Sequence, residues 1–199
     1  MITEYSYWVF RDVLSEKNRN KIKRTAKKSG YNKGEITTDS TDDISKTRNT
    51  DVAFSSESYL YDLFSPLIRG ANEGAGWKYD IDWFEPVQIA RYRKNQHYSW
   101  HTDGPSDHFG AYLSDNAGGE NFAGKVRKLS LVACLSNGYV GGDLELASQK
   151  PEEEDKIFYP EMKAGDVIIF PSYVFHRSTP VTKGVKYSAA IWCLGSPFK

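Results

Sequence analysis

The sequence has little cysteine, no net charge and no long apolar run, and each shortage excludes a class of protein. Its 199 residues include only two cysteines, Cys134 and Cys193. Both stand in apolar strand-like runs without the paired spacing of a zinc site, so we expect buried reduced thiols and no disulfide. Lysine plus arginine number 26, as do aspartate plus glutamate. This balance lacks the basic surface that holds a phosphate backbone, so we expect no nucleic-acid partner.

The hydropathy pattern argues against a membrane or secreted protein. No stretch reaches the roughly 20 apolar residues that cross a bilayer. Residues 1–10, MITEYSYWVF, lack the basic and apolar regions of a secretory signal. We therefore expect no membrane partner and a cytoplasmic location. The length fits one domain over residues 1–199, and nothing in the sequence indicates the oligomeric state.

Helix-forming residues are concentrated in the first part of the chain. Residues 8–28 favour a helix that ends before Gly30, and apolar spacing over residues 56–71 favours a second helix. The intervening residues 33–51 are polar and poor in aliphatic side chains, which indicates an exposed loop. We expect residues 1–75 to give helical support to a sheet formed by the rest of the chain.

After Gly76 the sequence changes to short runs rich in β-branched and aromatic residues, separated by turn residues. These runs are WKYDIDWFE, VQIARYR, HYSWHTD, KLSLVACLS, GDLELA, GDVIIF and VKYSAAIW. Two helices followed by strands without helices between them predict a mainly β fold. The expected form is an antiparallel sandwich or barrel that is buttressed on one face.

Histidine is also scarce, and two of the four histidines stand where a metal ion can be held. His101 and Asp103 are two residues apart, so in a strand they share one face. His176 follows the apolar run GDVIIFPSYVF and is expected near the end of a sheet. Two imidazoles and one carboxylate form the facial ligand set of non-haem Fe(II) sites. Alone, such a triplet is more often structural, and we expect His97 and His108 to be ordinary exposed residues.

The last apolar run, residues 185–193, divides into two faces. The apolar face consists of Val185, Tyr187, Ala189, Ile191 and Cys193, and the more polar face of Lys186, Ser188, Ala190 and Trp192. We expect the first face to pack in a core and the second to line a pocket. Lys186 would then be a buried cation that needs an anionic partner to stay charged. A solvated lysine at a sheet edge is the alternative.

Taken in order, these motifs resemble the iron(II)- and 2-oxoglutarate-dependent dioxygenases. The shared features are His-x-Asp, the strand Gly141-Gly142-Asp143-Leu144-Glu145-Leu146, the run GDVIIFPS, a histidine, PVTKG, a lysine and Tyr-Ser. The sequence most resembles the prolyl 4-hydroxylase-like branch, which includes small bacterial and phage proteins, over roughly residues 80–199. The resemblance implies a double-stranded β-helix, or jelly-roll, over residues 76–199, with iron between its sheets. The cytoplasm would then be that of a bacterium or of a virus-infected host cell.

Carried over by position, the resemblance implies an iron site. His101, Asp103 and His176 match the metal ligands. Lys186 matches the basic residue that pairs with the distal carboxylate of 2-oxoglutarate, although many relatives have arginine there. The alternatives for this role are Arg177 and Lys183. The presence of Asp103 argues against halogenation, for which relatives replace the carboxylate with a small residue.

The resemblance also implies contacts beyond the metal. The hydroxyl groups of Tyr92 and Ser130 match groups that reach the same carboxylate of 2-oxoglutarate. Trp192 matches a tryptophan near the pocket wall. Tyr98 matches an aromatic residue near the substrate entrance.

The implied activity requires Fe(II), 2-oxoglutarate and O₂, with ascorbate as a reductant, and yields succinate, CO₂ and a hydroxylated product. The implied substrate is a prolyl residue of a peptide or protein, and a free amino acid or other small molecule is the alternative. Residues 104–125, an irregular segment with Phe109, Tyr112 and Phe122, are expected to be a lid. A non-catalytic jelly-roll binding module is the alternative from another class, and a metal titration separates the two.

Overall fold

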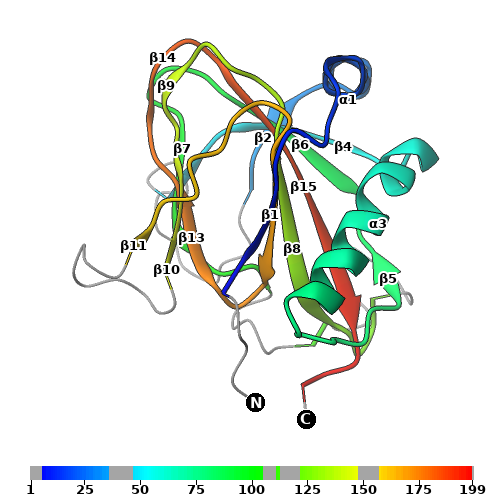
Figure 1. Ribbon diagram of the computed structural model, residues 1–199. Helices are drawn as coiled ribbons and strands as arrows, with labels where there is room; N and C mark the ends of the chain where they lie inside the picture. Colours follow the sequence, from blue (N-terminus) through cyan, green and yellow to red (C-terminus); the bar gives the residue numbers. More distant parts are fainter. Residues whose placement is uncertain (1–5, 36–46, 105–110, 113–121, 148–156, 199) are drawn as a thin grey trace.

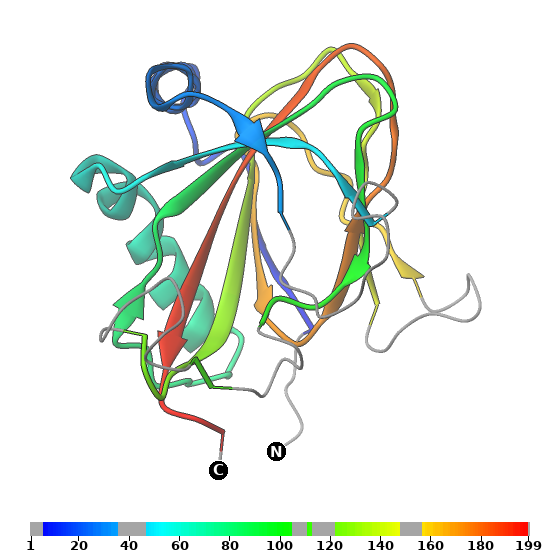
Figure 2. The ribbon, with the colours of Figure 1, turned by 180° about the vertical axis from the view of Figure 1, so that it is seen from behind.

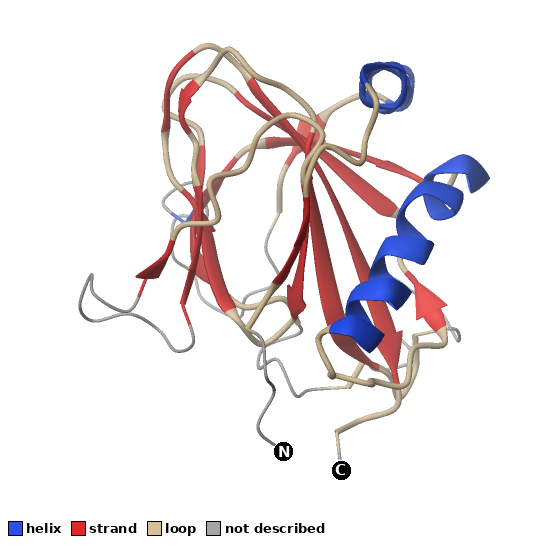
Figure 3. Cartoon of the chain, viewed as in Figure 1, coloured by secondary structure: helices blue, strands red, loops and turns tan. Residues whose placement is uncertain are grey.

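Two antiparallel sheets face each other, and two helices lie against the outer side of the larger sheet (Figure 1). This computed structural model describes residues 6–35, 47–104, 111–112, 122–147 and 157–198. Figure 3 shows the layers by secondary structure, with both helices on one side of the strands. The arrangement is the mainly β jelly-roll with buttressing helices that the sequence predicts.

The larger sheet contains most of the long strands. In spatial order these are β1 (Trp8–Phe10), β12 (Val167–Pro171), β8 (Val126–Cys134), β15 (Lys186–Gly195), β6 (Val87–Tyr92), β4 (Asp51–Ser55) and β2 (Asn32–Lys33), with β5 (Trp83–Phe84) paired to β15. The strands β8, β15 and β6 at its centre are buried on both faces, one against the helices and one toward the second sheet.

The smaller sheet faces the inner side of the larger one (Figure 2). Its order is β11 (Ile157–Phe158), β10 (Leu144–Ala147), β13 (Phe175–Ser178), β7 (His97–His101) and β3 (Arg48–Asn49). A separate pair of strands is formed by β14 (Val181–Lys183) and β9 (Val140–Gly141). The strands β7 and β13 are neighbours in this sheet, which brings distant parts of the sequence together.

Local sequence signals define both helices. Helix α1 (Glu16–Ser29) begins after Ser15, whose hydroxyl accepts a hydrogen bond from the Asn18 amide, and it ends at Gly30. Helix α3 (Ser58–Gly74) buries one apolar stripe. The buried helical residues Ile22, Ala26, Leu60, Phe64 and Ile68 form one core with the outer face of the larger sheet.

Strand β15 divides its side chains as the alternation predicts. Ala189, Ile191 and Cys193 pack in the core under the helices. Lys186, Ser188, Ala190 and Trp192 face the space between the two sheets, where they line a cavity. Both cysteines are buried and free, which also agrees with the prediction.

The first helix was predicted too long. Residues 8–10 form strand β1, with Trp8 opposite Ile169 of β12, and the helix starts only at Glu16. Tryptophan, valine and phenylalanine favour strands, and pairing with a partner some 160 residues away decides their conformation. The long-range contact therefore overrides the helical composition of the residues that follow.

The prediction of an exposed loop over residues 33–51 was also wrong where the structure describes it. Arg48, Thr50 and Asp51 are buried, and β3 and β4 add strands to both sheets. Asp51 is neutralised by the side chains of Lys33, Arg91 and Arg93. Polar residues can be buried when they are paired in this way, and composition does not show such pairing. Residues 1–75 thus contribute strands as well as helical support.

Within the part of the chain that is described, no helix combines the length and the apolar character needed to cross a membrane.

Candidate active site

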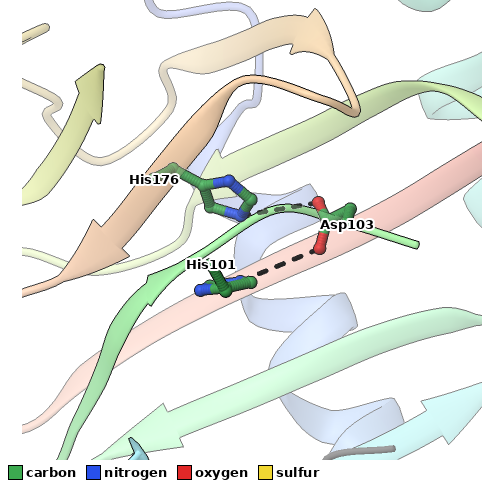
Figure 4. A group of neighbouring side chains, drawn as sticks. All are labelled: His101, Asp103 and His176. Carbon is green, nitrogen blue, oxygen red and sulfur yellow. Dashed lines mark ion pairs between the residues drawn. The ribbon is translucent and has the colours of Figure 1, made fainter. Parts of the chain in front are cut away.

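Two strands of the smaller sheet bring together the three predicted metal ligands (Figure 4). His101 ends β7 and stands opposite His176 of β13, and Asp103 follows two residues after His101. The Nε2 atom of His101 lies 3.8 Å from Oδ1 of Asp103, and Nε2 of His176 lies 3.4 Å from Oδ2. One ligand atom from each side chain lies within 4.8 Å of the other two.

Backbone carbonyl groups orient both imidazole rings. Nδ1 of His101 is 2.8 Å from the carbonyl oxygen of Ser99, and Nδ1 of His176 is 3.0 Å from that of Val174. A carbonyl oxygen only accepts, so each Nδ1 carries a proton, and in the neutral ring Nε2 has the lone pair. Both lone pairs belong to the nitrogen atoms that lie near Asp103, which is the arrangement that metal ligation requires.

Two serine side chains hold the carboxylate of Asp103. Ser130 donates a hydrogen bond of 2.6 Å to Oδ2. Its oxygen is 2.9 Å from that of Ser172, and the Asp103 amide donates to the Ser172 carbonyl. Because the hydroxyl hydrogen of Ser130 is used on Asp103, Ser172 is the donor to Ser130. The resemblance implies that Ser130 contacts 2-oxoglutarate, and this contact stays a prediction. In the structure its hydroxyl donates to Asp103, a predicted metal ligand.

The protonation states of the cluster suit a divalent cation. Burial, with a smaller effect of the neighbouring His176, lowers the pKa of His101 to about 3. Burial alone would raise the pKa of Asp103, but electrostatic interactions with His176, His101 and Arg127, together with the Ser130 hydrogen bond, outweigh it and lower the pKa to about 2. At neutral pH the site therefore offers a neutral imidazole at His101 and an ionised carboxylate. This donor set fits Fe(II).

A cavity of roughly 1440 Å³ opens beside the three ligands. Buried Lys186 lies among its lining residues, and so do the partly exposed aromatic side chains of Phe54 and Trp83. The cavity extends across the inner face of the larger sheet, over Ala190 and Gln88. It therefore offers a polar, buried part and an apolar mouth.

Lys186 is buried, with 6% of its surface exposed, so the alternative of a solvated edge lysine is wrong. Its Nζ donates to the carbonyl of Gly142 at 2.6 Å and to Oγ of Ser178 at 2.8 Å. Burial lowers the pKa of Lys186 to about 8. No carboxylate of the described residues lies within ion-pair distance of it. The third N–H of the ammonium group is available to a bound anion.

The other candidates for the cosubstrate cation are placed differently. Arg177 lines the cavity, but its Nε donates to Oε2 of Glu145 at 2.5 Å. Lys183 is exposed in β14 and does not line the cavity. Tyr92 stands directly opposite Lys186 in the neighbouring strand, and Nζ of Lys186 lies 5.1 Å from its ring centre. Burial raises the pKa of Tyr92, so its hydroxyl stays protonated and can donate.

A pair of oppositely charged residues in the cavity was not predicted. Arg127 of β8 makes two hydrogen bonds to the carboxylate of Glu85, at 2.6 and 2.7 Å. Its guanidinium group also lies 4.2 Å from a ring centre of Trp192, which lines the cavity as the resemblance implied. In the sequence, Arg127 and Glu85 each stand next to a predicted strand. Charged residues are common at such positions, so their placement does not indicate a site.

An aromatic ring stacks on one of the predicted metal ligands. The Tyr98 ring is stacked on the His101 imidazole, with ring centres 3.6 Å apart and planes 14° apart. Burial raises the pKa of Tyr98 to about 12. The guanidinium carbon of Arg48 lies 4.6 Å from the centre of the same ring. Tyr98 lines the cavity next to a metal ligand, and sequence reasoning missed Arg48 because its segment was predicted to be an exposed loop.

Part of the predicted lid lies outside the described residues, namely 105–110, with His108 and Phe109, and 113–121. Of its aromatic residues, Tyr112 and Phe122 line the cavity, with ring centres 5.7 Å apart. His97, in β7, does not line the cavity.

Residues 87–194, which include all three ligands and Lys186, match the model of the 2OG-Fe(II) oxygenase superfamily. The chain belongs to this superfamily. Fe(II) and 2-oxoglutarate are thus the cofactor and cosubstrate of its family, in agreement with the prediction. The residues of this chain suit both groups, because the histidines and Asp103 form an iron-type donor set and no described carboxylate is paired with Lys186.

Curated relatives match over about half of the chain. A PKHD-type hydroxylase of Xylella fastidiosa (strain M12) is 32% identical over 110 residues, which are 54% of this chain and 43% of that protein. A PKHD-type hydroxylase of Janthinobacterium sp. (strain Marseille) is 30% identical over 110 residues, 55% of this chain and 43% of that protein. The chain thus spans less than half the length of the curated relatives it matches.

Solved structures share the fold at low identity. The viral collagen prolyl hydroxylase vCPH from Paramecium Bursaria Chlorella virus-1, in its 2OG complex, is 22% identical with a TM-score of 0.66 and covers 96% of this chain and 97% of its own. A Trichoplax adhaerens prolyl hydroxylase, in complex with a hypoxia inducible factor peptide fragment, is 16% identical with a TM-score of 0.70 and covers 94% and 83%. These likenesses support the jelly-roll assignment.

Proposed function

We propose that this protein is a 2-oxoglutarate- and O₂-dependent hydroxylase of prolyl residues in a peptide or protein, with release of succinate and CO₂. The observation that carries the proposal is the convergence of His101, Asp103 and His176 in a cavity that also contains buried Lys186, which pairs with no carboxylate of the described residues. A non-catalytic jelly-roll has no need for these four side chains to line one cavity.

In this proposal the three side chains hold Fe(II), which, with 2-oxoglutarate bound, supplies O₂ activation and the oxidising power for C–H hydroxylation. The carbonyl groups behind the imidazoles fix the ring orientation, and Ser130 fixes Asp103. Lys186 binds the distal carboxylate of 2-oxoglutarate, and the Tyr92 hydroxyl adds a hydrogen bond. A lysine ammonium group is a point charge and cannot make the bidentate hydrogen bonds of an arginine. The Tyr92 hydroxyl therefore contributes more to binding here than it would beside an arginine.

The far wall of the cavity suits a peptide. Phe54, Trp83 and Phe122 give it an apolar surface on which a prolyl ring can pack. Nη1 of Arg127 makes no hydrogen bond to the described residues, while Nε and Nη2 are held by Glu85. The guanidinium group is therefore positioned to donate to a peptide carbonyl. The names of the solved structures that share the fold, a collagen prolyl hydroxylase and a prolyl hydroxylase with a bound peptide, support the same substrate class.

The test is turnover with a panel of prolyl peptides in the presence of Fe(II), 2-oxoglutarate and ascorbate. Peptide-dependent succinate release, together with a mass increase of one oxygen on the prolyl residue, is expected. His176→Ala should abolish both, and Lys94→Gln, which removes an exposed cation outside the cavity, should change neither. Succinate release that responds to a free amino acid and to no peptide would replace the peptide substrate by the small-molecule alternative. Absence of both metal binding and turnover would favour the binding module.

A further inference from the structure

The cavity is lined by four lysine or arginine side chains, and they differ in whether a carboxylate neutralises them. The four are Arg48, Arg127, Arg177 and Lys186. Arg127 and Arg177 are paired with Glu85 and Glu145. Among the described residues, no carboxylate lies within ion-pair distance of Lys186 or Arg48. An unpaired buried charge is costly, so a cation that is retained in a cavity indicates an anion supplied by a ligand.

Arg48 is buried, with 8% of its surface exposed. All its partners are neutral. Nη2 donates to Oε1 of Gln88 at 2.9 Å, and Nη1 donates to the backbone carbonyl of Glu35 at 2.8 Å. The Tyr98 ring covers one face of the guanidinium group. Within the part of the chain that the structure describes, the positive charge therefore remains uncompensated, since Glu35 contributes its carbonyl and not its carboxylate.

The geometry leaves donors free on the terminal nitrogens. A guanidinium group has five N–H donors, and two are used by Gln88 and Glu35. The Nε–H is buried without a partner, close to Gly34, where a Cβ atom would lie 2.6 Å from Nε. One N–H remains on each of Nη1 and Nη2. Such a pair suits the two oxygens of a carboxylate.

The position of Arg48 places this anion near the reaction centre. The Tyr98 ring has His101 stacked on it at 3.6 Å and Arg48 at 4.6 Å, so a single aromatic ring separates the cation from a metal ligand. Lys186 is the cation for the cosubstrate in the proposed function. Arg48 therefore remains as the cation that can bind an anionic group of the substrate.

We propose that Arg48 binds a carboxylate of the substrate, so that the preferred substrate carries an anionic group near the hydroxylated carbon. This inference rests on the proposed function and adds to it a specificity-determining residue. The carboxylate can belong to an acidic side chain beside the prolyl residue or to the α-carboxylate of a C-terminal or free proline. Both sources share the same chemistry, and matched ligands distinguish them.

The experiment measures binding by calorimetry and hydroxylation by mass spectrometry with ligands that differ only in charge. One set compares prolyl peptides with Asp or Glu beside the proline against their Asn or Gln forms. The other compares free with amidated C-termini, and N-acetylproline with N-acetylprolinamide. In the parent protein, one carboxylate form should bind about 10- to 100-fold more tightly than its amide, as expected for a charge-assisted contact. The set in which this preference occurs identifies the source.

Substitutions of Arg48 test whether it causes the preference for carboxylate over amide ligands. Arg48→Gln should abolish it, Arg48→Lys should retain part of it, and the surface control Lys94→Gln should retain all of it. Gly34→Ala, which leaves the charge in place but crowds Nε, should weaken the preference without removing it. Unchanged binding of Fe(II) and 2-oxoglutarate by Arg48→Gln shows that the variant is folded.

Three results would overturn the inference. Equal binding of carboxylate and amide forms by the parent, including no binding of either, would show that no substrate anion is recognised. A preference that survives Arg48→Gln would assign it to another residue. A loss of 2-oxoglutarate affinity in Arg48→Gln, with substrate preference unchanged, would make Arg48 a cosubstrate residue. Hydroxylation of prolyl peptides without a charge preference would refute this inference but leave the proposed function intact. Binding of the carboxylate ligands with an Arg48-dependent preference, but without hydroxylation, would support this inference and refute the proposed function.

Discussion

Ser130 donates its hydroxyl hydrogen to Oδ2 of Asp103 over 2.6 Å, and both residues are buried. The hydroxyl therefore fixes the rotation of the one carboxylate among the proposed metal ligands. Groups that orient a metal ligand in this way typically change metal affinity by about 10- to 100-fold. Ser130→Ala should weaken Fe(II) or Mn(II) binding by a factor in this range, as measured by calorimetry, while Ser130→Thr, which keeps the hydroxyl, should lose less. Unaltered metal affinity in Ser130→Ala, with weaker 2-oxoglutarate binding, would instead show that Ser130 contacts 2-oxoglutarate, as the family resemblance implied.

Lys186 should control the affinity for 2-oxoglutarate without controlling the affinity for metal. A charge-assisted hydrogen bond contributes about 1.5 to 3 kcal/mol, so Lys186→Ala should weaken 2-oxoglutarate binding by about 10- to 150-fold. The effect should appear as a higher KM for 2-oxoglutarate, and Lys186→Arg should be milder. Normal 2-oxoglutarate turnover by Lys186→Ala, combined with failure of Arg177→Ala or Lys183→Ala, would show that another cation binds the cosubstrate.

The affinity for 2-oxoglutarate should also depend on pH. Burial lowers the pKa of Lys186 to about 8, so in the free protein its ammonium group loses its proton as the pH rises through that value. Binding of a carboxylate requires the charged form, so affinity should be full below pH 8 and decline above it. Calorimetric titration of the Mn(II)-loaded protein from about pH 6.5 to 9.5 measures this, with Lys186→Arg as the control that keeps its charge. A decline of the same size in Lys186→Arg would place the titrating group elsewhere.

The pair of Arg127 and Glu85 should matter for stability as well as for the cavity. Both side chains are largely buried and joined by two hydrogen bonds, so removal of one partner leaves an uncompensated charge. Such a loss typically costs about 3 to 5 kcal/mol. Glu85→Leu and Arg127→Leu should each lower the free energy of unfolding by this order, measured by urea denaturation, and the double variant should recover much of the loss. Additive losses in the double variant would contradict the coupling of the two residues.

The cluster of candidate iron ligands could be predicted from the sequence because much of its pattern is local. A spacing of two residues puts His101 and Asp103 on one side of the chain in any extended conformation. Strand alternation alone correctly placed Lys186 in the cavity and Ile191 in the core. The resemblance then supplied the assignment of roles, which alternation does not give.

Contacts between distant segments could not be predicted in this way. Arg48 meets Gln88, 40 residues later, and Glu85 meets Arg127, 42 residues later. No periodicity links such positions, and a charged residue in a polar segment normally indicates exposure. The same limit explains the helix predicted over Trp8, where pairing with β12 decides the structure. The residues missed are thus those whose role arises only when separate strands come together.

The proposed function requires that His101, Asp103 and His176 bind one Fe(II) beside the 2-oxoglutarate site. The most direct measurement is an anaerobic titration of the metal-free protein with Fe(II), followed by 2-oxoglutarate, in the parent and in the double variant His101→Ala and His176→Ala. We expect one Fe(II) per parent chain, one 2-oxoglutarate that binds tightly only after the metal, and neither event in the double variant. Tight stoichiometric Fe(II) binding by the double variant would contradict this expectation.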